Sequence, residues 1–181
     1  REYGLSTYSK HSDGSGVAIS SRLRPILNMR PKYRHWLSPS LWQLNADLHL
    51  TDWLEEKKID FDVVTDEDLH LEGVELLNRY KCVLTGSHPE YSSEKMLAAY
   101  EQYQLNGGRW IYLGSDGFYW ISEYHPDNPN IIEVRKGEAG TRAWTANPGE
   151  YNNAFDGKYG GMWRARGIIP SKVCGLTFTA Y

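Results

Sequence analysis

The segment KCVLTGSHPEYSSEKMLAAYEQYQLNGG, residues 81–108, decides the fold that we expect for this chain. It opens on a short apolar run, residues 82–84, which is typical of a buried strand. After a polar loop, large side chains recur at the i, i+4 and i+7 positions of a helix, namely Met96, Tyr100 and Tyr103. The sequence Asn-Gly-Gly at 106–108 is typical of a helix C-terminus, and a second apolar run, residues 110–113, follows it. The order strand, loop, helix, strand predicts a parallel α/β unit.

The loop between the first strand and the helix, residues 86–91, carries the candidate functional groups. In open α/β sheets, ligands bind beyond the carboxyl ends of the strands, which places His88 and Glu90 in that crevice. A histidine and a carboxylate two residues apart, beside a tyrosine, form a group that binds a metal ion or transfers protons. The same pattern is typical of a surface loop with a polar helix cap, and spacing alone does not separate these two interpretations.

The composition indicates one globular domain that extends over residues 1–181. Hydrophobic residues make up 40% and charged residues 24%, and the 13 Tyr and 7 Trp predict an aromatic-lined core or pocket. The net charge of −3 argues against nucleic acid as a partner. No apolar stretch approaches the roughly 18 residues of a membrane helix, and the start lacks a signal-peptide pattern, so we expect a cytoplasmic protein without a membrane partner. Because the chain opens on Arg1 rather than Met, we expect it to be part of something longer.

Further apolar and alternating runs extend the α/β pattern along the chain. We expect strands at 2–8, 61–65, 131–135 and 173–179, a helix from Ser40, a short helix at 73–79, and a long irregular segment at 140–167. This order predicts a flavodoxin-like three-layer sandwich with a mostly parallel sheet, which is also the architecture of class I glutamine amidotransferases. Cys82 and Cys174 each lie in an apolar run and no CxxC motif occurs, so we expect buried thiols on adjacent strands in a reducing compartment.

The motifs favour oxygen ligands over nucleophilic or zinc chemistry. Cys82 lies within its strand, too early for an amidotransferase nucleophile, and Ser87 does not stand in a G-x-S-x-G elbow. No H-E-x-x-H motif is present. A carboxylate with phenolates favours a hard ion such as ferric iron. Tyr8 at the end of the first strand and Glu90 after the central strand would be neighbours in a flavodoxin-like sheet, so both side chains could reach one ion. Without Glu90, a tyrosine such as Tyr8 is far more often a core or rim residue.

Six segments carry a resemblance to a known family. They are TYSKHSDGSG (7–16), WLEEKKIDFDVVTDEDL (53–69), TGSHPEYSSEKM (85–96), GGRWIYLGSDGFYW (107–120), RKGEAGTRAW (135–144) and GGMWRARG (160–167). Together they resemble the C-terminal domain of the N,N-dimethylformamidase large subunit. The resemblance implies an amidotransferase-like fold, a mononuclear iron (Fe3+) held by two tyrosines and one glutamate, and hydrolysis of the amide to formate and dimethylamine. It also implies that the chain is the C-terminal part of a large subunit, which pairs with a small subunit and associates with itself.

Carried over position by position, the resemblance implies Glu90 and Tyr8 as two of the metal ligands. The second tyrosine ligand would precede Arg1. If the ligand set instead lies wholly inside the chain, Tyr91 and Tyr124 are the first alternatives for the third ligand.

The resemblance also implies the catalytic groups. His88 corresponds to a histidine that either orients a metal ligand or transfers protons, and Lys136 to a lysine that would stabilise developing negative charge. Asp116 stands where we expect the family to carry Asn, so an amide donor has become an acceptor near the substrate. These residues imply metal-assisted hydrolysis of a small amide, which the sequence does not identify further. The alternative from another class is a non-catalytic structural or subunit-interaction domain whose site is incomplete.

Overall fold

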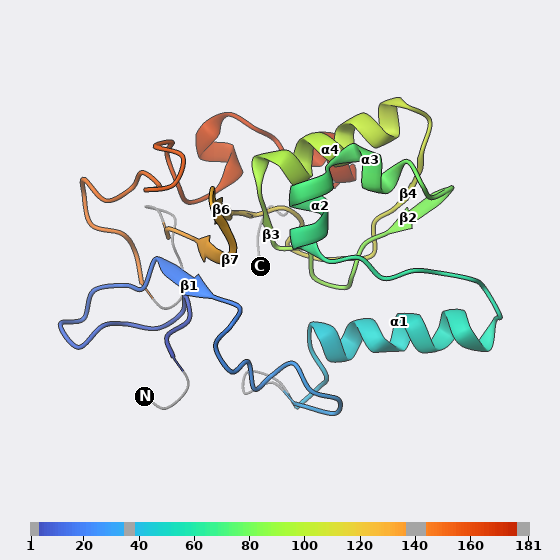
Figure 1. Ribbon diagram of the computed structural model, residues 1–181, viewed down its shortest axis with the longest axis horizontal. Coiled ribbons are helices and arrows are strands. Elements are labelled where there is room, and N and C mark those ends of the chain that lie inside the picture. Colours follow the sequence, from blue (N-terminus) through green and yellow to red (C-terminus); the bar gives the residue numbers. More distant parts are fainter. Residues whose placement is uncertain (1–3, 35–38, 137–143, 177–181) are drawn as a thin grey trace.

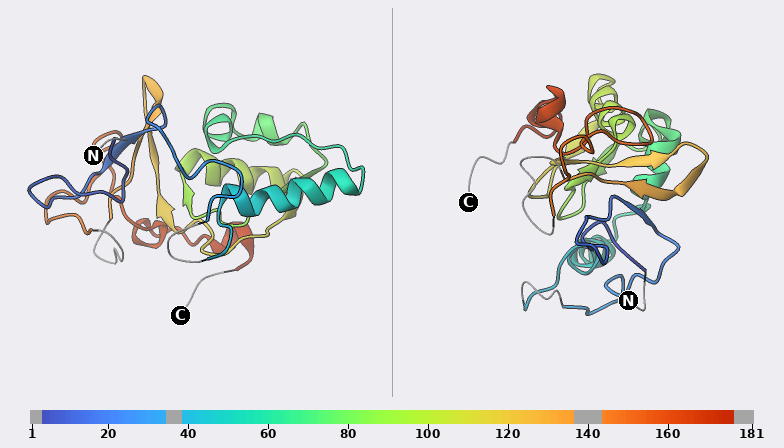
Figure 2. Two further views of the ribbon diagram at one scale, coloured as in Figure 1. Left: turned by 90° about the horizontal axis from the view of Figure 1, so that it is seen from below. Right: turned by 90° about the vertical axis from the view of Figure 1, so that its left-hand side faces the viewer.

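The computed structural model describes residues 4–34, 39–136 and 144–176 of the chain. The helices are α1 (Leu44–Glu56), α2 (Asp66–Glu72), α3 (Val74–Leu77), α4 (Glu94–Leu105), the 3-10 helix η1 (Trp163–Arg166) and α5 (Ser171–Cys174). The strands are β1 (Ile19–Ser21), β2 (Cys82–Leu84), β3 (Tyr91–Ser92), β4 (Arg109–Ile111), β5 (Trp120–Ile121), β6 (Glu123–His125) and β7 (Asn128–Glu133). Figures 1 and 2 show α2, α3 and α4 on one side of β2 and β4, and α1 on the other side. No helix in the described part of the chain combines the length and apolar character that a membrane span requires.

The strands of the described residues pair in three small sheets. β2 and β4 are parallel, with Val83 opposite Trp110, and β3 and β5 are parallel, with Tyr91 opposite Trp120. β1, β7 and β6 form an antiparallel sheet in that order. The α/β class and the parallel pairing are therefore confirmed, and the antiparallel sheet adds an element outside the expected pattern. The flavodoxin-like three-layer arrangement stays a prediction.

α4 has the boundaries and the buried face that its sequence predicts. Ser93 caps its N-terminus by accepting a hydrogen bond from the Met96 N–H at 3.3 Å. Just beyond its C-terminus, Gly107 adopts a left-handed φ of +85°, which a glycine adopts without steric cost. The three side chains of the helical pattern, Met96, Tyr100 and Tyr103, are all buried in the main core. The strand, loop, helix, strand unit is therefore confirmed.

The strands expected at residues 2–8 and 61–65 are wrong where the structure describes them. Residues 4–8 are irregular with a turn, and residues 1–3 of that expected strand lie outside the described residues. Residues 61–65 run without strand pairing into α2, where Thr65 and Asp68 form a capping box. The strand expected at 131–135 is confirmed as the end of β7, and the short helix expected at 73–79 is confirmed as α3. The helix expected from Ser40 begins at Leu44 as α1.

The strand expected at 173–179 is also wrong over its described part. Residues 171–174 form α5, which Pro170 precedes and which Gly175 ends with a φ of +76°; residues 177–181 lie outside the described part of the chain. Cys174 is therefore buried at the end of a helix, whereas Cys82 is half-buried on β2. The two thiols do not lie on adjacent strands.

A buried histidine on α2 makes the stability of this fold depend on pH. His70 is only 6% exposed, its Nδ1 lies 2.8 Å from Ser93 Oγ, and its ring contacts that of Tyr124 with centroids 4.3 Å apart. Burial, with a smaller effect of the nearby Lys95 charge, lowers the pKa of His70 from 6.5 to about 4. Between these two values the unfolded chain binds more protons than the folded one, so the folded state loses stability as the pH falls through this window.

We expect acidification from about pH 7 to about pH 5 to lower the free energy of unfolding by on the order of 1 kcal/mol through His70, after allowance for solvent screening. Urea unfolding at both pH values measures this, with the non-titrating His70→Asn variant as reference. The pH dependence should be smaller in the variant by that amount. Equal pH dependence in the two proteins would show that His70 contributes nothing.

Candidate active site

The candidate site lies where two loops leave neighbouring parallel strands. Residues 85–90 follow β2, and residues 112–118 follow β4. Thr85 joins the two segments, because its N–H donates to the carbonyl of the last residue of β4 at 3.0 Å. Gly114 lies directly against Pro89, since a Cβ added at Gly114 would come within 2.1 Å of Pro89 Cδ. Both loops are thereby held at the carboxyl ends of their strands, where α/β proteins bind ligands.

Three side chains from these loops, His88, Glu90 and Asp116, form what we call the acid cluster. His88 Nε2 lies 3.2 Å from Glu90 Oε2 and 3.7 Å from Asp116 Oδ2. One ligand atom from each residue lies within 4.8 Å of the other two, and the three side chains are 12%, 9% and 18% exposed. Asp116 has a left-handed φ of +49°, which Asp adopts more readily than most residues. One imidazole nitrogen and two carboxylates this close together can hold a cation or exchange a proton.

The His88 imidazole is oriented by contacts on several sides. Its Nδ1 lies 3.3 Å from Ser115 Oγ, and its ring lies beside that of Trp42, with centroids 5.3 Å apart. Nε2 is thus the nitrogen that faces the two carboxylates. Sequence reasoning missed both Ser115 and Trp42. Ser115 had a signal, because it precedes Asp116, but Trp42 lies far away along the chain and had none.

A second group of side chains, which we call the phenol cluster, surrounds a buried lysine. Lys136 is 0% exposed, and its Nζ donates to the Tyr91 hydroxyl at 2.8 Å. The same Nζ lies 4.5, 4.8 and 4.3 Å from the ring centroids of Tyr8, Tyr91 and Trp120. The hydroxyls of Tyr8 and Tyr91 are hydrogen-bonded to each other. A buried ammonium requires such compensation, which aromatic faces and a phenol oxygen provide.

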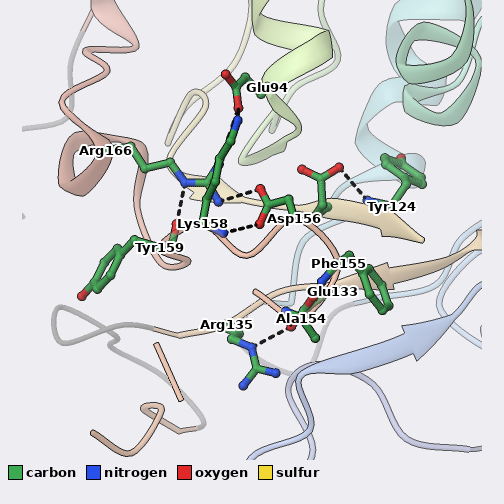
Figure 3. Close-up of polar contacts among 11 residues, drawn as sticks. Glu94, Tyr124, Glu133, Arg135, Ala154, Phe155, Asp156, Lys158, Tyr159 and Arg166 are labelled. Atoms are coloured by element: carbon green, nitrogen blue, oxygen red, sulfur yellow. Dashed lines mark hydrogen bonds and ion pairs between the residues drawn. The ribbon is translucent and has the colours of Figure 1, made fainter. Parts of the chain in front are cut away.

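Lys136 is brought there by the fixed end of β7. Glu133, the last residue of β7, is fully buried and accepts three hydrogen bonds. Its donors are Arg135 Nε at 2.6 Å and the N–H groups of Ala154 and Phe155 at 2.8 and 3.0 Å. Figure 3 shows these donors converging on the carboxylate from two segments of the chain. The direction in which the chain continues to Lys136 is thereby set.

The five site residues expected from the sequence thus fall into two groups. His88, Glu90 and Asp116 make up the acid cluster, whereas Tyr8 and Lys136 belong to the phenol cluster. Consecutive residues link the two groups, because Glu90 belongs to the first and Tyr91 to the second.

Tyr8 and Tyr124 differ in how they relate to this site. Tyr8 reaches the site although it stands in a turn rather than at a strand end, and its side chain is partly exposed. Its hydroxyl is hydrogen-bonded to that of Tyr91. Tyr124, which the sequence offered beside Tyr91 as an alternative third ligand, packs against His70 in the core.

Comparison with known proteins agrees with the resemblance drawn from the sequence. Residues 2–181 match the family model described as N,N-dimethylformamidase beta subunit-like, C-terminal. The chain is 49% identical over 179 residues to the N,N-dimethylformamidase beta subunit of Alcaligenes sp, and 49% identical over 179 residues to that of Paracoccus aminophilus. Each match covers 99% of this chain and 23% of the relative, so the chain spans about a quarter of the length of these proteins. The chain therefore belongs to the family of N,N-dimethylformamidase beta subunit-like C-terminal regions.

Proposed function

We propose that this chain provides active-site residues for hydrolysis of the C–N bond of a small linear amide such as N,N-dimethylformamide, with formate and dimethylamine as products. The observation that carries the proposal is the acid cluster at the ends of two parallel strands, in a chain 49% identical to dimethylformamidase beta subunits. As those relatives are named beta subunits, we also propose that a second kind of subunit, together with self-association, completes the enzyme.

The donor set fits the mononuclear ferric ion that the family resemblance implies. Glu90 offers a carboxylate, and Tyr8 offers a phenol oxygen that is hydrogen-bonded to the hydroxyl of Tyr91. Carboxylate and phenolate oxygens are the donors that a hard ion prefers. We assign Glu90 and Tyr8 as ligands, and a further tyrosine beyond this chain as the third. When bound, the ion would supply Lewis acidity, which polarises a carbonyl and makes water more acidic.

The residues of the acid cluster supply the proton transfers of the reaction. In amide hydrolysis a water oxygen bonds to the carbonyl carbon, the C–N bond breaks, and the leaving nitrogen takes up a proton. His88 Nε2, which faces the carboxylates of Glu90 and Asp116, is the group placed to deliver that proton. Ser115 at Nδ1 holds the ring in the orientation this requires. Asp116 accepts rather than donates hydrogen bonds, and we assign it to orienting His88 and the substrate.

Lys136 acts in this scheme through another side chain. Because it is fully buried, its ammonium does not meet the substrate directly. Its hydrogen bond to the Tyr91 hydroxyl, which in turn contacts the Tyr8 hydroxyl, carries its influence to the proposed ligand. Positive charge beside developing negative charge lowers the barrier of such reactions.

Two matched tyrosine variants test the ligand assignment in the protein that carries this chain. Tyr8→Phe should lose the visible phenolate-to-iron absorption and most of its iron, because it removes a proposed ligand oxygen. Tyr91→Phe removes the neighbouring hydroxyl and should keep both. Iron content, the visible spectrum and formate release from N,N-dimethylformamide are measured for wild type and both variants. A colourless, iron-free and inactive wild-type protein would instead support the non-catalytic interaction domain, and loss of iron in Tyr91→Phe would move the ligand role to Tyr91.

A further inference from the structure

A carboxylate from α1 holds the loop that carries His88. Asp47 lies in the first turn of α1, and its Oδ1 accepts a hydrogen bond from the Ser87 N–H at 2.6 Å. Hydrogen bonds from an N–H to an ionised carboxylate are shorter and stronger than those between neutral groups. The bond joins two segments that are far apart in the sequence. It is therefore a tertiary contact rather than a local turn.

The loop is shaped to admit this carboxylate. A Cβ added at Gly86 would lie 2.9 Å from Asp47 Oδ2, and 3.1 Å from Asp47 Cγ. Real Cβ atoms essentially never show the first distance, and the second is tighter than nine in ten real contacts. A side chain at position 86 would therefore push the Asp47 carboxylate away from its present place. On its other side, the Ser87 carbonyl accepts a hydrogen bond from the Ser115 N–H at 3.3 Å. The Ser87 residue is thus held from both sides, by α1 and by the loop after β4.

The start of α1 makes a second contact with the same loop. Trp42, just before the helix, places its ring 5.3 Å from that of His88. Figures 1 and 2 show that α1 lies on the opposite side of β2 and β4 from α2, α3 and α4. The beginning of this helix therefore meets the functional loop while the rest of the helix extends away from it.

We propose that Asp47 is a positioning residue, which fixes the Ser87 peptide and thereby the place of the His88 side chain in the acid cluster. His88 directly follows Ser87, and its Nε2 must stay near Glu90 and Asp116 to transfer a proton in the scheme above. Displacement of a catalytic group by about 1 Å costs up to roughly 100-fold in rate. The kinetic part of this inference rests on the proposed function, whereas the anchoring of Ser87 does not.

Three variants test the proposal in the protein that carries this chain. Asp47→Leu removes the acceptor at similar size, Asp47→Asn retains an oxygen that accepts more weakly, and Asp52→Leu makes the same change at an exposed position of α1. Amide hydrogen exchange of the peptide that contains Ser87 is measured with the α4 amides as an internal reference for global opening. Steady-state amide hydrolysis is measured in parallel, with kcat and KM determined separately.

The expected result is exchange of the Ser87 amide at least about tenfold faster in Asp47→Leu, with α4 unchanged. kcat should fall by about tenfold or more with KM nearly constant, Asp47→Asn should restore much of both, and Asp52→Leu should match wild type. Unchanged Ser87 exchange in Asp47→Leu would overturn the anchor. Faster exchange with unchanged kcat would overturn the positioning role. If wild type hydrolyses no amide, the proposed function fails, and the exchange data alone decide the anchor.

Discussion

Replacement of Glu90 by glutamine is expected to abolish iron retention and amide hydrolysis while leaving the fold intact. The Glu90 side chain is 9% exposed and is the proposed carboxylate ligand, and glutamine has nearly the same shape without the negative charge. A hard cation that loses its carboxylate loses a principal source of binding energy, so the iron content should fall below about a tenth of that in wild type. Iron per chain, formate release and circular dichroism measure the three parts of this expectation.

The control for this variant is Glu94→Gln, the same change four residues further along the chain. Glu94 lies on the exposed surface at the start of α4, where it pairs with Lys158 at 2.5 Å. It should keep wild-type iron and activity, because a surface ion pair contributes at most about 1 kcal/mol. Wild-type iron in Glu90→Gln would contradict the ligand assignment. Equal loss in both variants would show a general effect of charge.

The second large effect is expected at His88. Replacement by alanine should leave the iron content near that of wild type but lower kcat by a factor on the order of 10² to 10⁴, the range for loss of a general acid–base group. The reason is geometric, since His88 Nε2 lies 3.2 Å from Glu90 Oε2 and 3.7 Å from Asp116 Oδ2. Steady-state kinetics with iron analysis of the same preparations test this expectation.

His49→Ala is the matched control for this variant, because His49 is exposed on α1. It should behave like wild type. Unchanged turnover in His88→Ala would reduce His88 to a residue that shapes the loop. Loss of iron together with activity would assign His88 to the metal instead.

The central unit was predictable because its signals are local. The helical spacing of Met96, Tyr100 and Tyr103 and the glycine at 107 act within one or two turns of the helix they define. The same holds for the loop with His88 and Glu90, since the end of a parallel strand is itself a local feature. Two residues separated by one position in the same loop are close in any fold.

Segments with weaker signals were assigned wrongly because tertiary context decides them. The apolar residues at 173 and 174 fit a strand or a helix equally well, and Pro170 and Gly175 at their flanks favour a single turn of helix. Residues 61–65 have strand-like composition but pair with no strand among the described residues, so they form no part of a sheet there. Short apolar runs do not specify their own partners.

By itself, the amino-acid sequence determined the α/β class, the strand, loop, helix, strand unit around residues 81–113, the loop with His88 and Glu90, and membership of the dimethylformamidase family. Only the tertiary structure decided which side chains meet. It brought Asp116 to His88, Lys136 to Tyr8 and Tyr91, and Asp47 to Ser87. The physical reason is that these contacts join segments distant in sequence, whose approach depends on strand pairing and on glycines that allow close packing. Such contacts carry no periodicity that a sequence pattern can express.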